Sequence, residues 1–302
     1  MNSLPSSSSV AADGAAPDRY AVLGHPVAHS QSPFIHAEFA RQTGQLMHYD
    51  RIDCPPDGFE ARLRGFIASA DPQTGLGPVR GCNITVPFKF QVLPLARAVS
   101  ERATLAQAAN VLCFDAQGWS ADNTDGIGLV RDIEQHAGQR LAGRRALLIG
   151  AGGAAAGVLG PLIAAGCASI TVANRTLAKA LVLVERHQAW AERHGARLVA
   201  SGLEDCGEAF DLVLNSSASS LGGSAVPVHA RVLKPGALAL DLMYGPAAQA
   251  FLDWATAHGA VGRDGLGMLV EQAAEAFALW RGVMPETSPV LRKLRERLAL
   301  KV

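Results

Sequence analysis

Short apolar runs alternate with amphipathic stretches along the chain from Arg19 onward. In the first part, apolar runs rich in β-branched and aromatic residues predict strands, and the stretches between them predict helices. The predicted strands are 20–23, 46–52, 79–86 and 110–114, and the predicted helices are 32–41 and 59–69. Ser32 is the expected N-cap of the first helix, with Pro33 at its first helical position. This alternation is typical of a mostly parallel sheet covered by helices.

A second series of elements begins at 145–149, a continuously apolar strand of the kind that is buried on both faces. The chain then turns through four small residues, 150–153, into a helix. Further strands are predicted at 169–173, 212–214 and 237–240, and amphipathic helices at 268–280 and 289–300. The helix predicted at 124–136 is the natural connection between the two series. The fold class is therefore α/β, with room in 302 residues for two domains.

The composition argues against several classes of function. Hydrophobic residues make up 49% of the chain and charged residues 18%, and Lys plus Arg equals Asp plus Glu at 27 each, so no net field attracts nucleic acid or an anionic membrane. No apolar run approaches the roughly 18–20 residues of a membrane span. The five cysteines form no C-x-x-C pair, which favours reduced thiols in a cytosol over disulfides or a zinc site. Residues 1–17 lack the basic and apolar regions of a secretory signal and are interpreted as a disordered tail.

The glycine turn after the 145–149 strand is a candidate cofactor site. The pattern Gly150-x-Gly152-x-x-Ala155 follows a strand and opens a helix, where small residues let the backbone approach a pyrophosphate and the helix N-terminus supplies N–H donors. A tight turn that needs glycine for its backbone angles is the alternative explanation. Context favours the cofactor site.

The residues after the next strand select the cofactor. Roughly 20 residues beyond the turn, where an NAD enzyme carries an acid for the ribose 2′-hydroxyl, this chain has Asn174, Arg175 and Thr176. A carboxylate there would repel a 2′-phosphate, whereas Arg175 can bind one bidentately. A solvated arginine at a strand end is the alternative for Arg175. Its offset from the glycine turn favours NADP over NAD.

A second candidate site lies in the first series of elements. In Asn83-Ile84-Thr85-Val86-Pro87-Phe88-Lys89, Pro87 suits the first turn of a helix, which would place Lys89 near the positive end of the helix dipole. A cation is unfavourable in that position, so its presence indicates a binding partner or a role in a reaction. Upstream, Ser30 and Ser32 offer hydroxyls for an anion, although both could serve only the local helix. His25 and His29 are separated by a proline and have no third ligand, so no metal site is predicted.

These motifs together resemble the shikimate dehydrogenase family, and the resemblance runs from about Arg19 to the C-terminus. It is carried by the serine pair, Asn83 to Lys89, Asp122-Asn123-Thr124-Asp125-Gly126, the glycine turn, Asn174 to Thr176, and Asp264-Gly265-Leu266-Gly267-Met268. The family implies reversible, NADP-dependent reduction of 3-dehydroshikimate to shikimate in aromatic amino-acid biosynthesis. It also implies a substrate domain (18–124 plus 264–302), a Rossmann-type NADP domain (125–263) and a cleft between them.

The resemblance also carries residue roles onto matching positions of this sequence. Lys89 and Asp125 are the implied catalytic residues. The implied substrate-binding residues are Ser30, Ser32, Asn83, Thr85, Lys89, Asn110, Asp125, Tyr244 and Gln272. The implied cofactor-binding residues are Gly150, Ala151, Gly152, Gly153, Ala154, Asn174, Arg175, Thr176, Lys179, Ser217, Leu242 and Gly265. The chain departs from the family pattern at Val111, Ser220 and Gln249.

The chemistry assigned to Lys89 depends on its surroundings. Hydride transfer to a ketone needs a proton donor at the developing alkoxide and no metal. If Asp125 lies beside Lys89, its carboxylate outweighs the opposing helix dipole, so Lys89 is expected to be protonated at rest. Asp125 could instead act only as the N-cap of its helix.

Two other functions compete with this interpretation. One is a quinate/shikimate dehydrogenase or related paralogue, and the other is a non-catalytic NADP-sensing regulator, which would be expected to lose Lys89 or Asp125. The expected partner is a small-molecule substrate, with no nucleic acid and no membrane, and the expected state is a cytoplasmic monomer or homodimer.

Overall fold

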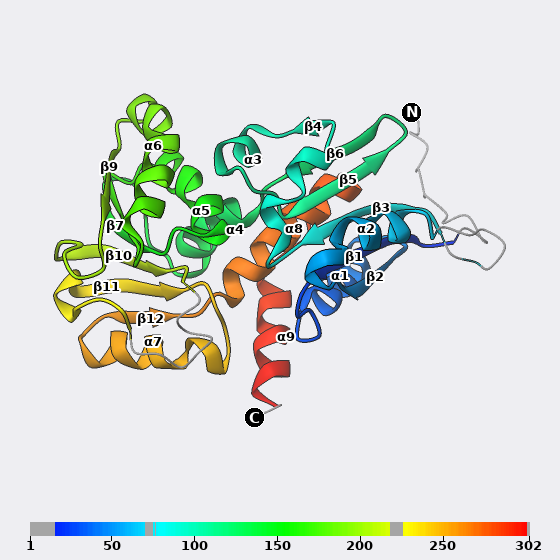
Figure 1. Ribbon diagram of the computed structural model, residues 1–302. Helices are drawn as coiled ribbons and strands as arrows, with labels where there is room; N and C mark the ends of the chain where they lie inside the picture. Colours follow the sequence, from blue (N-terminus) through cyan, green and yellow to red (C-terminus); the bar gives the residue numbers. More distant parts are fainter. Residues whose placement is uncertain (1–15, 70–74, 76, 218–225, 301–302) are drawn as a thin grey trace, which may run out of the picture.

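The computed structural model describes residues 16–69, 75, 77–217 and 226–300, and it contains two six-stranded sheets flanked by helices (Figure 1). Most of the tail expected at 1–17, and Ser220, lie outside the described residues. The α/β fold class is confirmed.

The first sheet has the strand order β2-β1-β3-β5-β6-β4. β1 pairs in parallel with β2 and β3, whereas β5 is antiparallel to both β3 and β6. Its strands are β1 (Asp18–Gly24), β2 (Met47–Asp53), β3 (Val79–Ile84), β4 (Ala98–Val99), β5 (Val111–Asp115) and β6 (Gly118–Asp122). The accompanying helices are α1 (Ser32–Thr43), α2 (Phe59–Ile67) and α3 (Glu101–Ala106). The short strands β4 and β6 were not predicted, because their polar and apolar residues follow no clear alternation.

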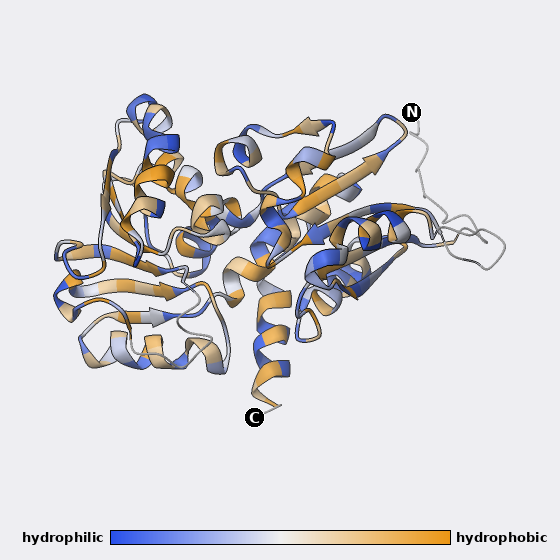
Figure 2. Ribbon diagram, in the orientation of Figure 1, coloured by the Kyte–Doolittle hydropathy of each residue, from blue (hydrophilic) through white to orange (hydrophobic). Residues whose placement is uncertain are grey.

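The second sheet is parallel throughout, with the order β12-β11-β10-β7-β8-β9. Four of the five β7 residues are fully buried, as predicted for a strand covered on both faces. The strands are β7 (Arg145–Ile149), β8 (Ser169–Ala173), β9 (Arg197–Ser201), β10 (Phe210–Asn215), β11 (Leu233–Asp241) and β12 (Val261–Arg263). The helices are α5 (Gly153–Ala164), α6 (Leu177–Arg193) and α7 (Pro246–Ala257). The interior strands of this sheet are coloured mainly as hydrophobic in Figure 2.

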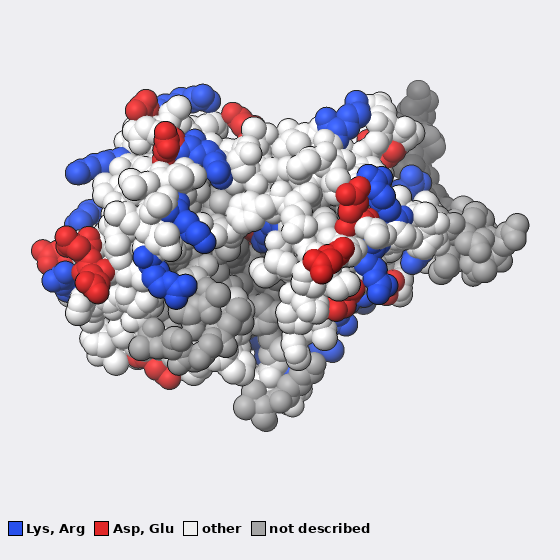
Figure 3. Space-filling view, viewed as in Figure 1, with Lys and Arg blue, Asp and Glu red and all other residues white. Residues whose placement is uncertain are grey.

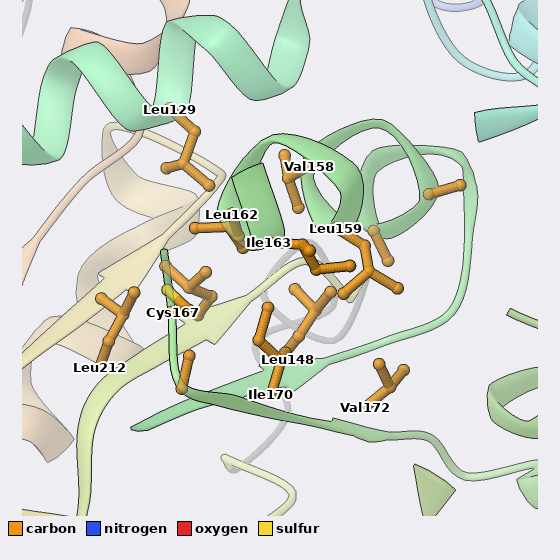
Figure 4. Close-up of a cluster of buried hydrophobic side chains, with 14 of the residues drawn as sticks. Leu129, Leu148, Val158, Leu159, Leu162, Ile163, Cys167, Ile170, Val172 and Leu212 are labelled. Atoms are coloured by element: carbon orange, nitrogen blue, oxygen red, sulfur yellow. The ribbon is translucent and has the colours of Figure 1, made fainter. Parts of the chain in front are cut away.

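The two sheets are connected through α4 (Asp125–Arg131), which continues as a single π-helical turn over Asp132–His136, and through α8 (Leu266–Arg281). α9 (Ser288–Ala299) packs on α8 and α1. Leu129 of α4 joins the buried cluster formed by α5 and the second sheet (Figure 4). α4 is therefore packed between the two halves.

Two glycines permit this packing of α4. A Cβ atom on Gly126 would lie 2.4 Å from the carbonyl oxygen of Gly157 in α5. On Gly128 it would lie 2.6 Å from the backbone nitrogen of Gln272 in α8. Real Cβ atoms do not approach backbone so closely, so any larger residue would separate the helices.

Local expectations at three residues are wrong. Gln31, not Ser32, is the N-cap of α1, so Ser32 is the first helical residue and Pro33 the second. No α-helix follows Pro87, because residues Phe88–Phe90 form only a short 3₁₀ turn. Lys89 therefore does not experience the dipole of a long helix. The alternative role of Asp125 as an N-cap is also excluded, because Asp125 is the first residue of α4 and the N-cap is Thr124.

Among the described residues, no helix is long and apolar enough to span a membrane. All five cysteines are free, and four of them are buried.

Candidate active site

Lys89 and Asp125 form a close ion pair between the two halves of the chain. The Nζ atom of Lys89 lies 2.5 Å from Oδ2 of Asp125. The two side chains are only 16% and 7% exposed, so water screens their attraction weakly. Lys89 comes from the loop after β3 and Asp125 from the start of α4, which places the pair where the first sheet meets the connecting helix.

The other oxygen of Asp125 is held by Asn110. The Nδ2 group of Asn110 donates to Oδ1 of Asp125 at 2.9 Å and to Oε1 of Gln272 at 3.0 Å. Its Oδ1 atom accepts from the backbone nitrogen of Thr124 at 2.8 Å. Asn110 is 3% exposed and therefore links the loop before β5, the start of α4 and α8 from inside the protein. This network fixes the plane of the Asp125 carboxylate.

Asn123 fixes the backbone beneath this carboxylate. Its Oδ1 accepts from the backbone nitrogen of Asp125 at 3.1 Å, and its Nδ2 donates to the carbonyl oxygen of Ala108 at 2.9 Å. Asn123 therefore satisfies the first backbone N–H group of α4 from the position before the N-cap residue Thr124. The carboxylate of Asp125 is left for Lys89 and Asn110.

The serine pair lies at the start of α1. The hydroxyl of Ser30 donates to that of Ser32 at 3.2 Å, and the backbone nitrogen of Ser32 donates to Oγ of Ser30 at 3.3 Å. The guanidinium of Arg51 donates twice to the carbonyl oxygen of Ser30, at 2.9 and 2.6 Å. Two hydroxyls, a helix N-terminus and a nearby guanidinium together suit a carboxylate ligand.

Thr85 and Tyr244 border the same region. Thr85 is partly buried and lies against Gly24 at the end of β1. Tyr244 packs against the cluster that α1, α8 and α9 form. Burial raises the pKa of the Tyr244 hydroxyl, and the charge of Arg51 partly offsets this rise. Tyr244 therefore lies within electrostatic range of the residue that holds the serine loop.

The glycine turn of the second sheet lies directly beside Lys89. A Cβ atom placed on Gly153 would be 3.8 Å from Cβ of Lys89 and 3.4 Å from the ring of Phe90. One placed on Gly157 would be 3.3 Å from Oδ2 of Asp125. The structure thus brings the ion pair and the start of α5 together. Figure 3 shows a hollow between the two halves of the molecule, with blue side-chain atoms visible inside it.

The turn has the geometry that a pyrophosphate requires. Gly150 has φ +110°, which a residue with a side chain rarely adopts, and a Cβ there would meet Ser216 at 2.7 Å. Gly152 is the N-cap of α5 and has open space around its Cα. Gly153 and Ala154 follow as the first helical residues, whose N–H groups have no partner within the helix. The backbone at this position therefore fits a dinucleotide, bound at the carboxyl ends of parallel strands.

The remaining cofactor candidates lie at the ends of neighbouring strands. Ser217 donates from its hydroxyl to Oδ1 of Asn215 at 2.7 Å, directly beside Gly150. Leu242 and Gly265 touch each other, because a Cβ on Gly265 would lie 2.3 Å from the carbonyl oxygen of Leu242. Buried Asn215 and Asp241 are joined at 2.9 Å and hold the ends of β10 and β11 in register.

Arg175 and Lys179 are exposed after β8. Neither forms a salt bridge among the described residues, so both charges are available to a 2′-phosphate. Asn174 donates to the carbonyl oxygen of Thr176 at 2.9 Å and shapes this turn. A hollow of about 290 Å³ adjoins it, lined by Phe90, Ala151, Ala156, Ala178, Lys179, Val182, Leu183 and Arg186.

Sequence reasoning missed the residues that support the site. Asn123 and Thr124 lie in the motif from Asp122 to Gly126, but no role was predicted for either residue. Arg51 and Tyr49 gave no local signal, because their partners, Ser30 and Asn83, are 21 and 34 residues away.

Family profiles match three parts of the chain. The shikimate dehydrogenase substrate binding domain matches residues 22–112, and the shikimate / quinate 5-dehydrogenase profile matches residues 132–222. The shikimate 5'-dehydrogenase C-terminal domain matches residues 265–295.

Individual proteins agree with these matches. The shikimate dehydrogenase (NADP(+)) of Methylibium petroleiphilum is 63% identical over 94% of this chain and 96% of its own length. A crystal structure of an Ael1 enzyme from Pseudomonas putida is 45% identical, with a TM-score of 0.80, and the match covers 92% of this chain and 98% of that one. A shikimate 5-dehydrogenase from Thermus thermophilus in complex with NADP(H) and shikimate is 32% identical, with a TM-score of 0.77, and the match covers 93% and 100% of the two chains.

Proposed function

The chain belongs to the shikimate dehydrogenase family, as an NADP-dependent oxidoreductase acting on a CH–OH group, and we propose that Lys89 and Asp125 are its proton-transfer pair. The reaction is the reversible reduction of 3-dehydroshikimate to shikimate. The observation that carries this proposal is the 2.5 Å contact between Lys89 and Asp125 beside the glycine turn.

NADPH supplies the hydride when it is bound. The residues that would hold it are the turn from Gly150 to Ala154, Arg175 and Lys179, with Asn174, Thr176, Ser217, Leu242 and Gly265 around them. Their fit is supported by the left-handed backbone at Gly150, the open space at Gly152 and two exposed cations that form no salt bridge within the described residues.

Lys89 completes the reduction by giving a proton from Nζ to the carbonyl oxygen as that oxygen becomes a hydroxyl. Asp125 keeps the ammonium in position and stabilises its charge, while Asn110 keeps the carboxylate from rotating away. In the oxidation direction, Lys89 takes the hydroxyl proton back. The protein thus provides a pre-positioned general acid and base.

The substrate binds opposite the turn. Ser30 and Ser32 receive its carboxylate, and Asn83, Thr85, Asn110, Tyr244 and Gln272 surround the ring and its hydroxyl groups. Substrate binding is assigned to residues 18–124 plus 264–302 and cofactor binding to 125–263, with closure of the cleft excluding water from the reaction. The chain passes between these domains at α4 and again after β12. A hydrogen bond connects these two segments, because Oδ2 of Asp132 accepts from Nε of Arg263 at 2.9 Å.

We further propose that the protein is cytoplasmic, is a monomer or homodimer, and has no nucleic-acid or membrane partner. Free, mostly buried thiols fit a reducing compartment.

Steady-state assays that cross shikimate and quinate with NADP and NAD test the function. Shikimate with NADP should give the highest kcat/KM. Preferential turnover of quinate would assign the chain to the quinate branch of the family, and absence of turnover with any pair would contradict the enzymatic proposal in favour of a cofactor-sensing regulator.

A further inference from the structure

We propose that Tyr49 is a positioning residue for substrate binding: its hydroxyl fixes the side-chain amide of Asn83 so that an N–H group is presented to the ligand. The inference rests on the proposed function in one respect, that Asn83 contacts the substrate. Tyr49 lies on β2 and Asn83 on β3, and the phenol reaches across the intervening strand β1.

The contact between the two residues is short and buried. The hydroxyl of Tyr49 lies 2.5 Å from Oδ1 of Asn83, and the residues are 8% and 6% exposed. A hydrogen bond in such a place has little competition from water, and losing it would leave a buried oxygen without a donor.

The orientation of the Asn83 amide follows from its other neighbour. Its second polar group lies 3.1 Å from the backbone carbonyl oxygen of Asn110. A carbonyl oxygen can only accept, so the group that faces it is the NH₂, and the group that faces Tyr49 is the oxygen. Tyr49 must therefore be the donor. No flipped arrangement satisfies both contacts equally well.

We assign the second hydrogen of the Asn83 amide to a ligand, because neither ring nitrogen of buried His36, the other polar neighbour of this amide, forms a hydrogen bond. The NH₂ group has two hydrogens, and Asn110 uses one of them. Asn83 precedes Thr85 and Lys89 in the same segment, and Asn110 itself bonds Asp125, so the remaining N–H belongs to the substrate region. A hydroxyl or carboxylate oxygen of a polyhydroxylated acid is a suitable acceptor. A flipped amide would offer an oxygen instead and would repel that acceptor.

The surroundings of Tyr49 keep it a permanent donor. Burial raises the pKa of its hydroxyl well above 10 and outweighs the opposing interaction with the Ser32 side chain, so the proton stays in place at any working pH. The ring of His36 stacks on that of Tyr49 with 4.3 Å between centroids, and burial lowers the pKa of His36 to about 3. The imidazole therefore remains neutral and packs on the phenol, and its interaction with the Asn83 side chain only partly opposes the fall in pKa. The hydrogen bond from Tyr49 to Asn83 is therefore expected to be independent of pH between the pKa of His36 and that of Tyr49.

Tyr49→Phe removes the hydroxyl and keeps the stacked ring. We expect KM for shikimate to rise about 3- to 10-fold, the range for one lost hydrogen bond, with kcat within about two-fold of normal and KM for NADP unchanged. Calorimetric titration of shikimate without cofactor should show the same loss of affinity. A merely structural role would instead lower the thermal midpoint and leave KM unaltered.

Tyr20→Phe is the matched control. Tyr20 is also buried, lies on the adjacent strand β1 and contacts the ring of Trp280, but its hydroxyl accepts from Arg281 and does not contact Asn83. This variant should bind shikimate as the unmodified protein does.

A double-mutant cycle decides whether Tyr49 acts through Asn83. Asn83→Ala should weaken shikimate binding at least as much as Tyr49→Phe, and adding Tyr49→Phe to it should have no further effect. Unchanged affinity in folded Tyr49→Phe, or an equal second loss in the Asn83→Ala background, would overturn the inference. Failure of the proposed function is distinguishable, because it would appear as no shikimate turnover in the unmodified protein.

Discussion

The two sides of the cleft are organised in opposite ways. On the substrate side, the charged and amide groups of Lys89, Asp125, Asn110 and Gln272 are already bonded to one another. On the cofactor side, the backbone of the glycine turn is pre-shaped, but Arg175 and Lys179 form no salt bridge within the described part of the chain.

This difference matches what each side has to do. Proton transfer needs a donor held within a fraction of an ångström of its productive position, so its side chains are fixed by buried hydrogen bonds before the substrate arrives. Phosphate recognition on an exposed surface needs charge within reach but tolerates motion, because the ligand itself orders the side chains. Mutations of the proton-transfer pair should therefore affect kcat, and mutations of the exposed cations on the cofactor side should affect KM for the cofactor.

The largest effect is expected from Lys89→Ala. Loss of the proton donor should lower kcat by about 10²–10⁴-fold, the usual span for a positioned acid–base group. KM for shikimate should change less, because Ser30 and Ser32 still bind its carboxylate and Thr85 still contacts the ring. Steady-state kinetics measure both; a normal kcat would remove Lys89 from the chemistry.

Asp125→Asn tests whether the pair acts as a unit. The variant keeps the shape and removes the charge, so folding should be normal while kcat falls strongly. The double mutant with Lys89→Ala should be little worse than the poorer single variant. Losses that multiply would mean that the two residues act independently.

Arg175→Ala tests the cofactor side. Removing charge-assisted hydrogen bonds to the 2′-phosphate should raise KM for NADP by about 10- to 100-fold and leave KM for NAD and kcat nearly unchanged. Parallel kinetics with both cofactors provide the measurement. An equal loss for NAD would show that Arg175 does not discriminate between them.

Gly128→Ala tests the packing that holds the substrate side together. The added methyl would lie 2.6 Å from the backbone of Gln272, so α4 and α8 must separate, at a cost of about 1–3 kcal/mol in the free energy of unfolding. Turnover should fall as well, since Asp125 and Gln272 move apart.

Gly65→Ala is the control for this substitution. Gly65 lies inside α2 with nothing within 4 Å of a Cβ, so the same change should stabilise the protein by about 0.4–1 kcal/mol. If both variants behave alike, the close approach of α4 and α8 is not what limits the site.

The smallest effect concerns pH and stability. Burial lowers the pKa of His187 to about 4, below the 6.5 of the unfolded chain. A depressed folded-state pKa means that unfolding takes up a proton, so the stabilisation is present above pH 6.5 and is lost as the pH falls toward 4. Between pH 7.5 and 5.5 this amounts to about 1.4 kcal/mol. Denaturant unfolding of His187→Gln should lack this part of the pH dependence.

His194→Gln provides the comparison. His194 lies on the solvent side of the same region and also contacts the carbonyl four residues earlier, at 2.9 Å. Its replacement removes an exposed imidazole with the same carbonyl contact and therefore separates the effect of burial from that of the contact. The role of burial at His187 would be contradicted if both substitutions, or neither of them, removed this part of the pH dependence of stability.

Much of the fold follows from local pattern. The continuous apolar run at 145–149, the glycine turn after it and Arg175 at its fixed offset are local signals, and such signals predicted the four inner strands of the second sheet and the cofactor preference, but not the edge strands β9 and β12. The first sheet was likewise predicted without β4 and β6, because these strands are short and gain their strand structure only from neighbours.

The sequence by itself determined which residue types reach the site and in what order, because motifs with fixed spacing carry their own turns and strand ends. Only the tertiary structure decided how they act. Asn110 and Gln272 are 162 residues apart and meet because Gly128 lets α8 approach α4. The dipole expected at Lys89 disappeared because Pro87 leads into a short 3₁₀ turn. Contacts between distant segments depend on how whole elements pack, and no local pattern encodes that packing.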